Sequence, residues 1–271
     1  MEIGHHLREL WQYRELIYNL VVRDLKVRYK SSVLGIAWSW LNPLLMMVVY
    51  TIFFTIFLHN ADIPYYPVFL LCGLLPWNFF TDSVLQATGS VVNSAYLIKK
   101  VYFPREVLPI SIVLSSLVNF LIALPLFFAL ALIFGAPLTR WVLLLPVTIL
   151  IQVAFTIGLT LILSTLNVFY RDTQIILGVI MVAWFFLTPV FYPITRIPQE
   201  AHVLGIQFDA QLWLRRLNPM ASLIASYRDL LYRGAPTGLD FLLRTAVTAL
   251  IVLVVGYLVF LRYSPRFGEE V

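Results

Sequence analysis

A short polar segment between two long apolar stretches holds the residues of this sequence that are best suited to binding. Residues 93–109 read NSAYLIKKVYFPREVLP. The segment combines the cations Lys99, Lys100 and Arg105 with aromatic side chains, among them Tyr102 and Phe103. Aromatic and Arg side chains are the types that anchor protein interfaces, whereas any cytoplasmic membrane loop also collects Lys and Arg. Residue chemistry alone leaves both interpretations open.

A polar stripe lies inside one of the apolar stretches. Asn78, Asp82 and Gln86 recur at helical spacing, so they share one face of a helix. A carboxylate within a membrane span is the group that an ion-coupled carrier needs. This one lies toward the cytoplasmic end of its stretch, where a structural hydrogen bond is equally consistent. A proton relay and a structural role both stay open.

The motifs of common catalytic sites are absent from the sequence. No Gly is followed by Lys, so the phosphate-binding GxxxxGK[ST] loop is missing. The four histidines have no metal-binding spacing, and no G-x-S-x-G elbow occurs. The single cysteine, Cys72, cannot form an intrachain disulfide. We therefore predict no catalytic residue, metal or cofactor in this chain, and any uphill transport would draw on another polypeptide or an ion gradient.

Composition indicates a membrane protein. The chain has 271 residues, 61% of them hydrophobic and 12% charged, against about 25% charged in soluble domains. Several apolar runs reach the roughly 20 residues that a membrane-crossing helix needs, and they lack the alternation of a barrel strand. The net charge of +5 fits an excess of Lys and Arg in cytoplasmic loops rather than nucleic-acid binding. We predict an all-α membrane protein.

Six spans are predicted, preceded by an amphipathic helix over residues 2–30 that lies on the membrane surface or packs on a partner. The predicted spans cover residues 34–58, 65–86, 107–134, 141–166, 173–192 and 245–261. We expect no cleavable signal peptide before them, because the basic N-terminal segment has no early apolar core.

The charge distribution predicts the orientation. An even number of spans places both termini on one side, together with the basic segment at 99–105 and the Arg residues of the tail. The positive-inside rule assigns this side to the cytoplasm. The long outer connection, residues 193–244, mixes apolar and charged residues and is predicted to form short helices at the outer interface, with a half-helix over 223–232.

Four segments then resemble a known family in their order and spacing. They read VRDLKVRYKSSVLGIAWSWLNPLL, YLIKKVYFPREVLP, NVFYRD followed by FFLTPVFYP, and LNPMASLIASYRDLLY, and they extend from about Arg23 to Tyr232. The chain resembles the permease subunit of ABC-2 transporters that export lipid-linked polysaccharides such as O-antigen, capsule and wall teichoic acid.

The resemblance implies one transmembrane domain over residues 1–271. Its parts would be an interface helix (1–33), a six-span region (34–262) with re-entrant helices before the last span, and a cytoplasmic tail (263–271). It also implies a second copy of the chain, two ATP-binding cassette subunits that hold ATP and Mg, a lipid-linked glycan substrate and contact with membrane lipid. The location implied is the bacterial cytoplasmic membrane.

The resemblance also implies that the segment after residue 97 forms a coupling helix that docks in the ATPase subunit. The implied docking residues are Ile98, Lys99, Lys100, Val101, Tyr102, Phe103, Pro104, Arg105 and Glu106. Lys99, Lys100 and Arg105 would pair with acidic groups of the ATPase, while Tyr102 and Phe103 would fill an apolar cleft. A generic positive-inside loop with aromatic residues at the membrane boundary is the alternative.

Two further sets of residues are candidates for substrate contact. Basic residues before the first span would meet anionic lipid, each contributing about 1 kcal/mol, or the pyrophosphate of a lipid-linked substrate; topology alone also explains them. These are Arg23, Lys26, Arg28 and Lys30. Aromatic rings stack on the C–H faces of sugars, although most membrane aromatics pack or mark the interface. The candidates are Tyr50, Phe53, Phe54, Phe57, Trp184, Phe185, Phe191 and Tyr192.

Two alternatives remain for the function. An ABC-2 exporter of drugs or lipids would share the fold. A membrane enzyme acting on lipid-linked sugars would need a cluster of acidic or His residues near one membrane face, and the sequence contains none that we recognise.

Overall fold

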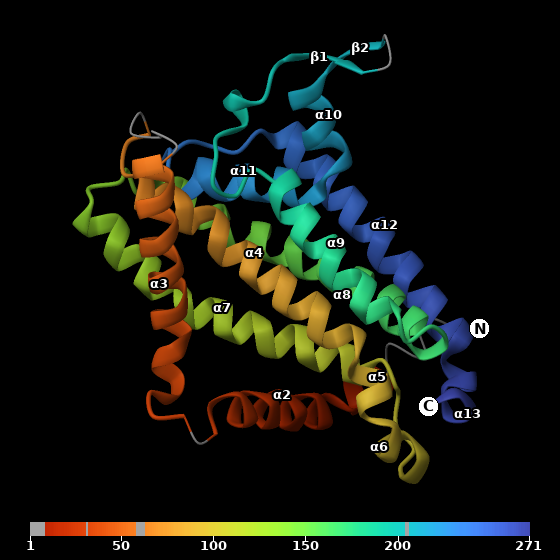
Figure 1. Ribbon diagram of the computed structural model, residues 1–271. Helices are drawn as coiled ribbons and strands as arrows, with labels where there is room; N and C mark the ends of the chain where they lie inside the picture. The colour runs from red at the N-terminus through yellow and green to blue at the C-terminus, as the bar shows by residue number, and fades with distance from the viewer. Residues whose placement is uncertain (1–8, 31, 58–62, 204–205) are drawn as a thin grey trace.

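The protein is a bundle of long helices with one helix lying across its end (Figure 1). The computed structural model describes residues 9–30, 32–57, 63–203 and 206–271. Among these, five helical segments are long and apolar enough to cross a membrane: Gly35–Thr55, Tyr66–Thr88, Val107–Ile133, Arg140–Phe169 and Leu239–Glu270. This confirms the membrane class and five of the predicted spans.

The helices within these segments follow the apolar runs closely. They are α3 (Trp38–Ile52), α4 (Tyr66–Thr88), α7 (Val107–Ile133), α8 (Leu145–Phe169) and α12 (Leu239–Tyr263). A 3₁₀ turn at Gly35–Ala37 precedes α3 and a π-helical turn at Phe53–Phe57 follows it. A helix satisfies its backbone groups internally, which is why such runs cross lipid as helices.

The fifth predicted span is shorter than expected. Helix α9 covers Thr173–Leu187, 15 residues instead of the predicted 173–192. Just before it, Phe169 packs against Phe267 of the C-terminal segment, with ring centroids 6.2 Å apart. Just after it, the Phe191 carbonyl accepts a hydrogen bond from the Tyr66 hydroxyl, at the start of α4 (2.9 Å). The segment from Phe169 to Phe191 therefore runs from one end of the bundle to the other.

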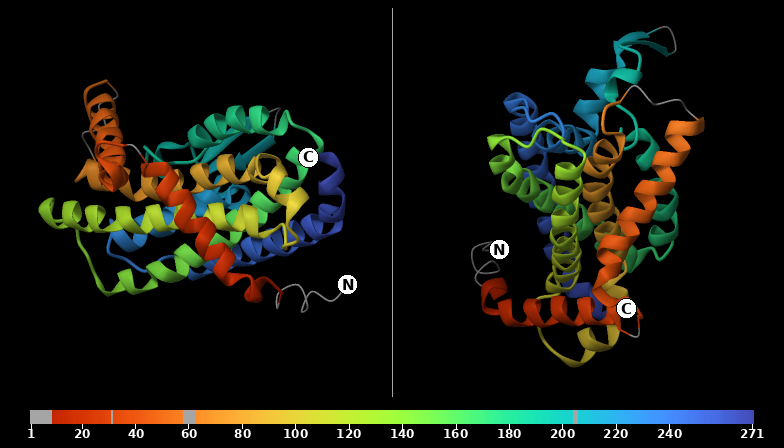
Figure 2. Two further views of the ribbon diagram at one scale, coloured as in Figure 1. Left: turned by 90° about the horizontal axis from the view of Figure 1, so that it is seen from below. Right: turned by 90° about the vertical axis from the view of Figure 1, so that its left-hand side faces the viewer.

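Helix α2 (Arg14–Tyr29) lies across the end of the bundle that also carries the C-terminus, as the right-hand view of Figure 2 shows. Its Leu20 is buried in a cluster with Phe103, Val107 and Leu108. The apolar face of α2 thus covers the start of α7. Trp11, just before α2, is 70% exposed. Placement of this helix on a membrane surface stays a prediction.

The outer connection contains a β-hairpin, which corrects the all-α prediction for this part. Strands β1 (Glu200–Val203) and β2 (Ile206–Asp209) pair antiparallel. The register pairs Glu200 with Asp209, Ala201 with Phe208, His202 with Gln207 and Val203 with Ile206. Apolar residues alternate with polar ones on both sides of Leu204–Gly205 in the sequence. This alternation is the hairpin signal, and the mixed composition of the whole connection concealed it.

Two helices follow the hairpin: α10 (Ala210–Leu217) and α11 (Pro219–Leu231). The second confirms the predicted half-helix at 223–232 and starts earlier. Its start is fixed by Asn218, whose side-chain oxygen accepts hydrogen bonds from the backbone N–H groups of Met220 (3.1 Å) and Ala221 (3.2 Å). Pro219 at the first helical position needs no such partner.

The last span also begins earlier than the sequence indicated, at Leu239 instead of Thr245. Arg244 lies inside the helix, where its guanidinium donates to the Arg215 carbonyl (3.1 Å) and sits 5.0 Å from the Phe241 ring centroid. These contacts stabilise the Arg244 charge within the helix, whereas the hydropathy pattern predicted that the span would begin after it. Helix α12 packs most extensively on α8, where a Cβ on Gly158 would lie 2.5 Å from the Leu253 backbone.

Candidate functional site

A short basic helix projects from the end of the bundle, past the level of α2 (Figure 1). Helix α5 (Ser90–Asn93) leads into this projecting helix, α6 (Ala95–Lys100), and α7 follows. Lys99 and Lys100 are exposed, Val101 is 54% exposed and Tyr102 is 84% exposed. The Lys100 ammonium lies 4.0 Å from the centre of the Tyr96 ring. The structure thus presents two cations and two exposed aromatic rings, Tyr96 and Tyr102, at the tip of the molecule.

The rest of the predicted docking segment is turned inward. Phe103 is 5% exposed and packs against Leu20 of α2. The Arg105 guanidinium donates a hydrogen bond to the Ser264 carbonyl, and Glu106 is buried. Ile98 and Pro104 are half-buried. In this structure Phe103 and Arg105 therefore hold the projecting segment against the chain's own N- and C-terminal parts, a role that the sequence did not indicate.

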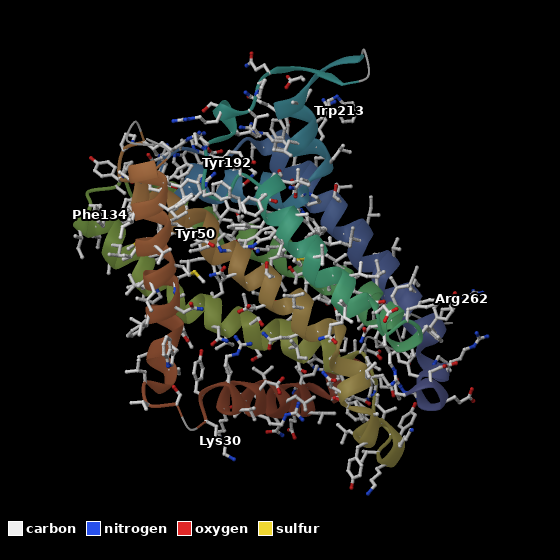
Figure 3. The ribbon with its side chains drawn as sticks, in the orientation of Figure 1. Lys30, Tyr50, Phe134, Tyr192, Trp213 and Arg262 are labelled. Carbon is white, nitrogen blue, oxygen red and sulfur yellow. The ribbon has the colours of Figure 1, made fainter. Side chains whose placement is uncertain are left out.

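The four predicted basic residues before the first span do not form one site. Arg23, Lys26 and Lys30 are exposed on one face of α2 and its end; Figure 3 shows Lys30 pointing away from the bundle. Arg23 pairs with its neighbour Asp24 at 2.9 Å. Arg28 lies on a different face and turns inward, toward α4. Only three of the four cations are thus available to an anionic surface.

Arg28 meets the polar stripe of α4. Its guanidinium lies 3.8 Å from the Asp82 carboxylate and donates to the Gln86 side-chain oxygen (3.0 Å). The Asp82 side chain is 53% exposed, and its charge is balanced by this partner. The arrangement favours the structural interpretation of Asp82 over a proton relay. No group of three or more His, Cys, Asp or Glu among the described residues could hold a metal ion.

Several of the predicted aromatic residues gather between α3, α9 and the segment after α9. Phe54 stacks on Phe191 with ring centroids 4.6 Å apart, and Phe185 lies 5.5 Å from Phe191 and 6.3 Å from Tyr50. Tyr50 lies well away from Lys30 along the bundle (Figure 3). The structure therefore joins four of the eight residues, from two segments far apart in the sequence, into one aromatic cluster.

The remaining predicted aromatics have other surroundings. Trp184 faces the protein interior, where its ring contacts Phe80 (5.2 Å) and its N–H donates to the Asn218 side chain (2.9 Å). Phe53 and Tyr192 lie at the edge of the cluster, each in edge contact with one of its rings. The Phe57 side chain lies outside the described part of the chain.

Sequence analysis missed a buried arginine beside this cluster. Arg228 of α11 is 5% exposed, and its guanidinium donates to the backbone carbonyls of Pro189, Val190 and Tyr192. It also lies 3.7 Å from the centre of the Phe69 ring. Burial lowers the pKa of Arg228 to about 9, so it stays charged at neutral pH. Arg228 anchors the turn after α9 to α4 and α11, and its only sequence signal was an Arg within an apolar helix.

Comparison with protein families matches residues 15–232 to the model described as ABC-2 type transporter. The match covers the projecting α6, the aromatic cluster and α11.

Curated relatives match along most of their own length. The O-antigen export system permease protein RfbA of Myxococcus xanthus is 39% identical over 265 residues, which cover 98% of each chain. A protein of the same name from Klebsiella pneumoniae is 36% identical over 256 residues, 94% of each chain. The polysialic acid transport protein KpsM of Escherichia coli is 24% identical over 223 residues, 79% of this chain and 80% of its own.

Proposed function

This chain belongs to the ABC-2 type transporter family, and from that premise we propose that it is the permease subunit of an ABC exporter for lipid-linked polysaccharide. The observation that carries the proposal is the match to two O-antigen export permeases over nearly the full length of both chains. The match to a polysialic acid transport protein favours a polymer over a drug as the cargo.

The energy for export would come from a separate ATP-binding subunit. The sequence has no phosphate-binding loop, so ATP and Mg would bind that partner, and two copies of each subunit would complete the exporter. The exposed tip of α6, with Lys99, Lys100 and Tyr102, would dock on the ATPase subunit. Cations and aromatic rings on a projecting helix suit an acidic, partly apolar cleft.

Six crossings are part of the proposal, with α9 as the fifth. At 1.5 Å per residue its 15 residues are about 22 Å long, less than the roughly 30 Å of hydrocarbon. The flanking residues that run to Phe191 would supply the remainder. Contacts of Leu20 with Phe103, and of Arg105 with Ser264, place the N- and C-terminal parts at one end of the bundle. An even number of crossings requires this arrangement, and the excess of Lys and Arg assigns that end to the cytoplasm.

The glycan would pass along the aromatic cluster of Tyr50, Phe54, Phe185 and Phe191. Aromatic rings offer flat apolar faces to the C–H faces of sugars. Here Tyr50 and Phe185 come from α3 and α9, which are mostly exposed, and Phe54 and Phe191 come from the segments that follow these helices. Helices α10 and α11 would form the re-entrant part on the outer side, held to the end of α9 by Arg228.

Co-purification from the native host tests the coupling part of the proposal. We expect tagged wild-type protein in mild detergent to bring down an ATP-binding subunit with ATPase activity. A Lys99→Glu, Tyr102→Ala variant should recover at least tenfold less of that subunit, because loss of one interface anchor of about 1.4 kcal/mol already lowers affinity tenfold. The variant leaves Phe103 and Arg105 in place.

Tyr18→Ala is the matched control, since Tyr18 is 67% exposed on α2 and distant in sequence from α6. It should recover as much ATPase subunit as the wild type. Equal recovery with the α6 variant would refute docking through α6. Absence of any ATPase subunit with folded wild-type protein would contradict the ABC exporter itself.

A further inference from the structure

A polar cavity lies on the α2 side of α4. Its volume is about 330 Å³, at the lower end of the range of small-ligand sites, about 300–1,000 Å³. Its walls come from the end of α2, the first turns of α3, the second half of α4 and the middle of α7. The cavity therefore sits between four helices at the end of the bundle that we assign to the cytoplasm.

Four of the polar side chains that line the cavity keep hydrogen-bonding groups without a partner. Asn42, which is exposed, and Asn78, which is half-buried, line the cavity, and neither amide makes a hydrogen bond within the described residues. The Ser116 hydroxyl and the Asn119 side-chain NH₂ also line it, and both are buried without a hydrogen-bond partner. Leaving the buried Ser116 and Asn119 groups unpaired is costly. These two and the two amides come from three helices, and their convergence indicates a ligand that supplies several hydrogen bonds.

The charges of the cavity indicate that the ligand is neutral. Its charged residues among those described are Arg28 and Asp82, which lie 3.8 Å apart and balance each other. A phosphate or pyrophosphate site would present an excess of cations. The exposed Lys26 and Lys30 on the outer face of α2 do not line this cavity. The cavity thus differs in chemistry from the basic face that would meet a pyrophosphate.

Aromatic side chains complete the walls. Trp38 of α3 and Phe79 and Phe120 from α4 and α7 line the same space. Rings beside amides and hydroxyls are the combination that holds a sugar: C–H faces pack on the rings, and hydroxyls exchange hydrogen bonds with the amides. Asn78 also lines a second cavity of about 380 Å³ on a neighbouring face of α4, together with Tyr50 and Phe185. The polar cavity thus adjoins the aromatic cluster.

We propose that this polar cavity binds one or two neutral sugar rings of the glycan before they reach the aromatic cluster. The inference rests on the proposed export function and adds a site to it. Asn42 and Asn78 would donate to and accept from sugar hydroxyls, with Ser116 and Asn119 at the inner wall. Asp82, held by Arg28, would accept from a further hydroxyl.

Saturation-transfer NMR on the permease in nanodiscs tests the cavity directly. The probe is a mixture of short oligosaccharides released by mild acid from the host's own lipid-linked polysaccharide. Asn42→Leu and Asn78→Leu replace each amide by an apolar side chain of similar shape. Neither amide makes a hydrogen bond to another described residue. We expect transfer to sugar protons with wild type, and at least fivefold less with either variant. Asn93→Leu, on α5 and outside the cavity, should match the wild type.

The outcomes separate the cavity from the proposed function. Deletion of the gene, scored for surface polysaccharide, tests the function alone. If deletion abolishes surface polysaccharide while the oligosaccharides show no transfer, or show equal transfer with all variants, the cavity inference is wrong and the function stands. If deletion leaves surface polysaccharide intact, the proposed function fails. Equal saturation of glycerol at the same site would also overturn the assignment to sugar rings.

Discussion

Helices α3 and α4 belong to spans of equal mean hydropathy but have opposite surroundings. In the most apolar 18-residue stretch of the span that contains α3, only 11% of the residues are buried. In the corresponding stretch of α4, 78% are buried. Lipid tails are as apolar as a protein interior, so hydropathy does not distinguish a helix that faces lipid or a second copy from one at the centre of the bundle. The difference shows that α4 forms the core of the bundle and that α3 presents a surface to lipid or to a second copy.

Helix α9 resembles α3 in this respect. Of its residues only Leu177 and Met181 are buried, and its exposed side chains include Val179 and Phe186. The aromatic cluster thus lies between two helices with little internal packing, while α4 carries the contacts to α7, α8 and α11. This separation predicts that matched substitutions have large effects in α4 and small effects in α9.

The largest effect is expected from Phe80→Ala. Phe80 of α4 is fully buried, and its ring lies within 6 Å of Trp77, Phe155 and Trp184. Removing it should cost about 3–5 kcal/mol of unfolding free energy, measured in detergent, because the cavity left behind cannot collapse. Phe186→Ala on α9, at a residue 59% exposed, should change stability by less than about 1 kcal/mol. Similar losses in the two variants would contradict the comparison.

Arg228→Met should have the next largest effect, about 3 kcal/mol. The substitution leaves three backbone carbonyls of the turn after α9 without their donor, and each unsatisfied buried acceptor costs about 1–3 kcal/mol. Arg233→Met is the control, since Arg233 is half-exposed and pairs with Asp229 on the surface of α11 (2.9 Å). That control should lose less than about 1 kcal/mol. Thermal unfolding of both variants in the same detergent measures the two losses of stability, and equal losses would contradict the prediction.

A smaller difference is expected between two glycines. A Cβ on Gly73 of α4 would lie 2.8 Å from the Val190 carbonyl oxygen, whereas one on Gly178 of α9 would meet nothing within 4 Å. Gly73→Val should therefore cost about 1–3 kcal/mol through overpacking, and Gly178→Val should be nearly neutral. If Gly178→Val proves as destabilising as Gly73→Val in isolated protomers, α9 is packed more tightly than this structure has it.

Sequence reasoning succeeded where one strong signal decided the outcome. Apolar run length located the helices α3, α4, α7 and α8 to within a few residues, because the bilayer sets their length. The polar segment before Val107 predicted the position of α6, because a charged segment between two membrane-length apolar runs must lie outside the lipid. The half-helix at 219–231 was recognised because its apolar residues were too few to cross a membrane.

The failures have a common physical cause, which is that tertiary partners change what a residue does. In the sequence, Arg244 indicates a helix boundary. In the structure it lies inside α12, where it contacts the Arg215 carbonyl and the Phe241 ring. Phe103 and Tyr102 are adjacent aromatics, yet one packs on Leu20 and the other is exposed. The polar cavity joins residues from four separate helices, and no spacing rule links them along the sequence.

Transport in inverted membrane vesicles tests the central claim most directly. Vesicles from a strain lacking the chromosomal gene would carry either wild-type permease or the Lys99→Glu, Tyr102→Ala variant, together with radiolabelled lipid-linked glycan on the outer, cytoplasmic face. We predict that ATP moves the glycan into the lumen, where it is protected from added glycosidase, only with the wild type. Protection that does not depend on this permease or on ATP would contradict the account.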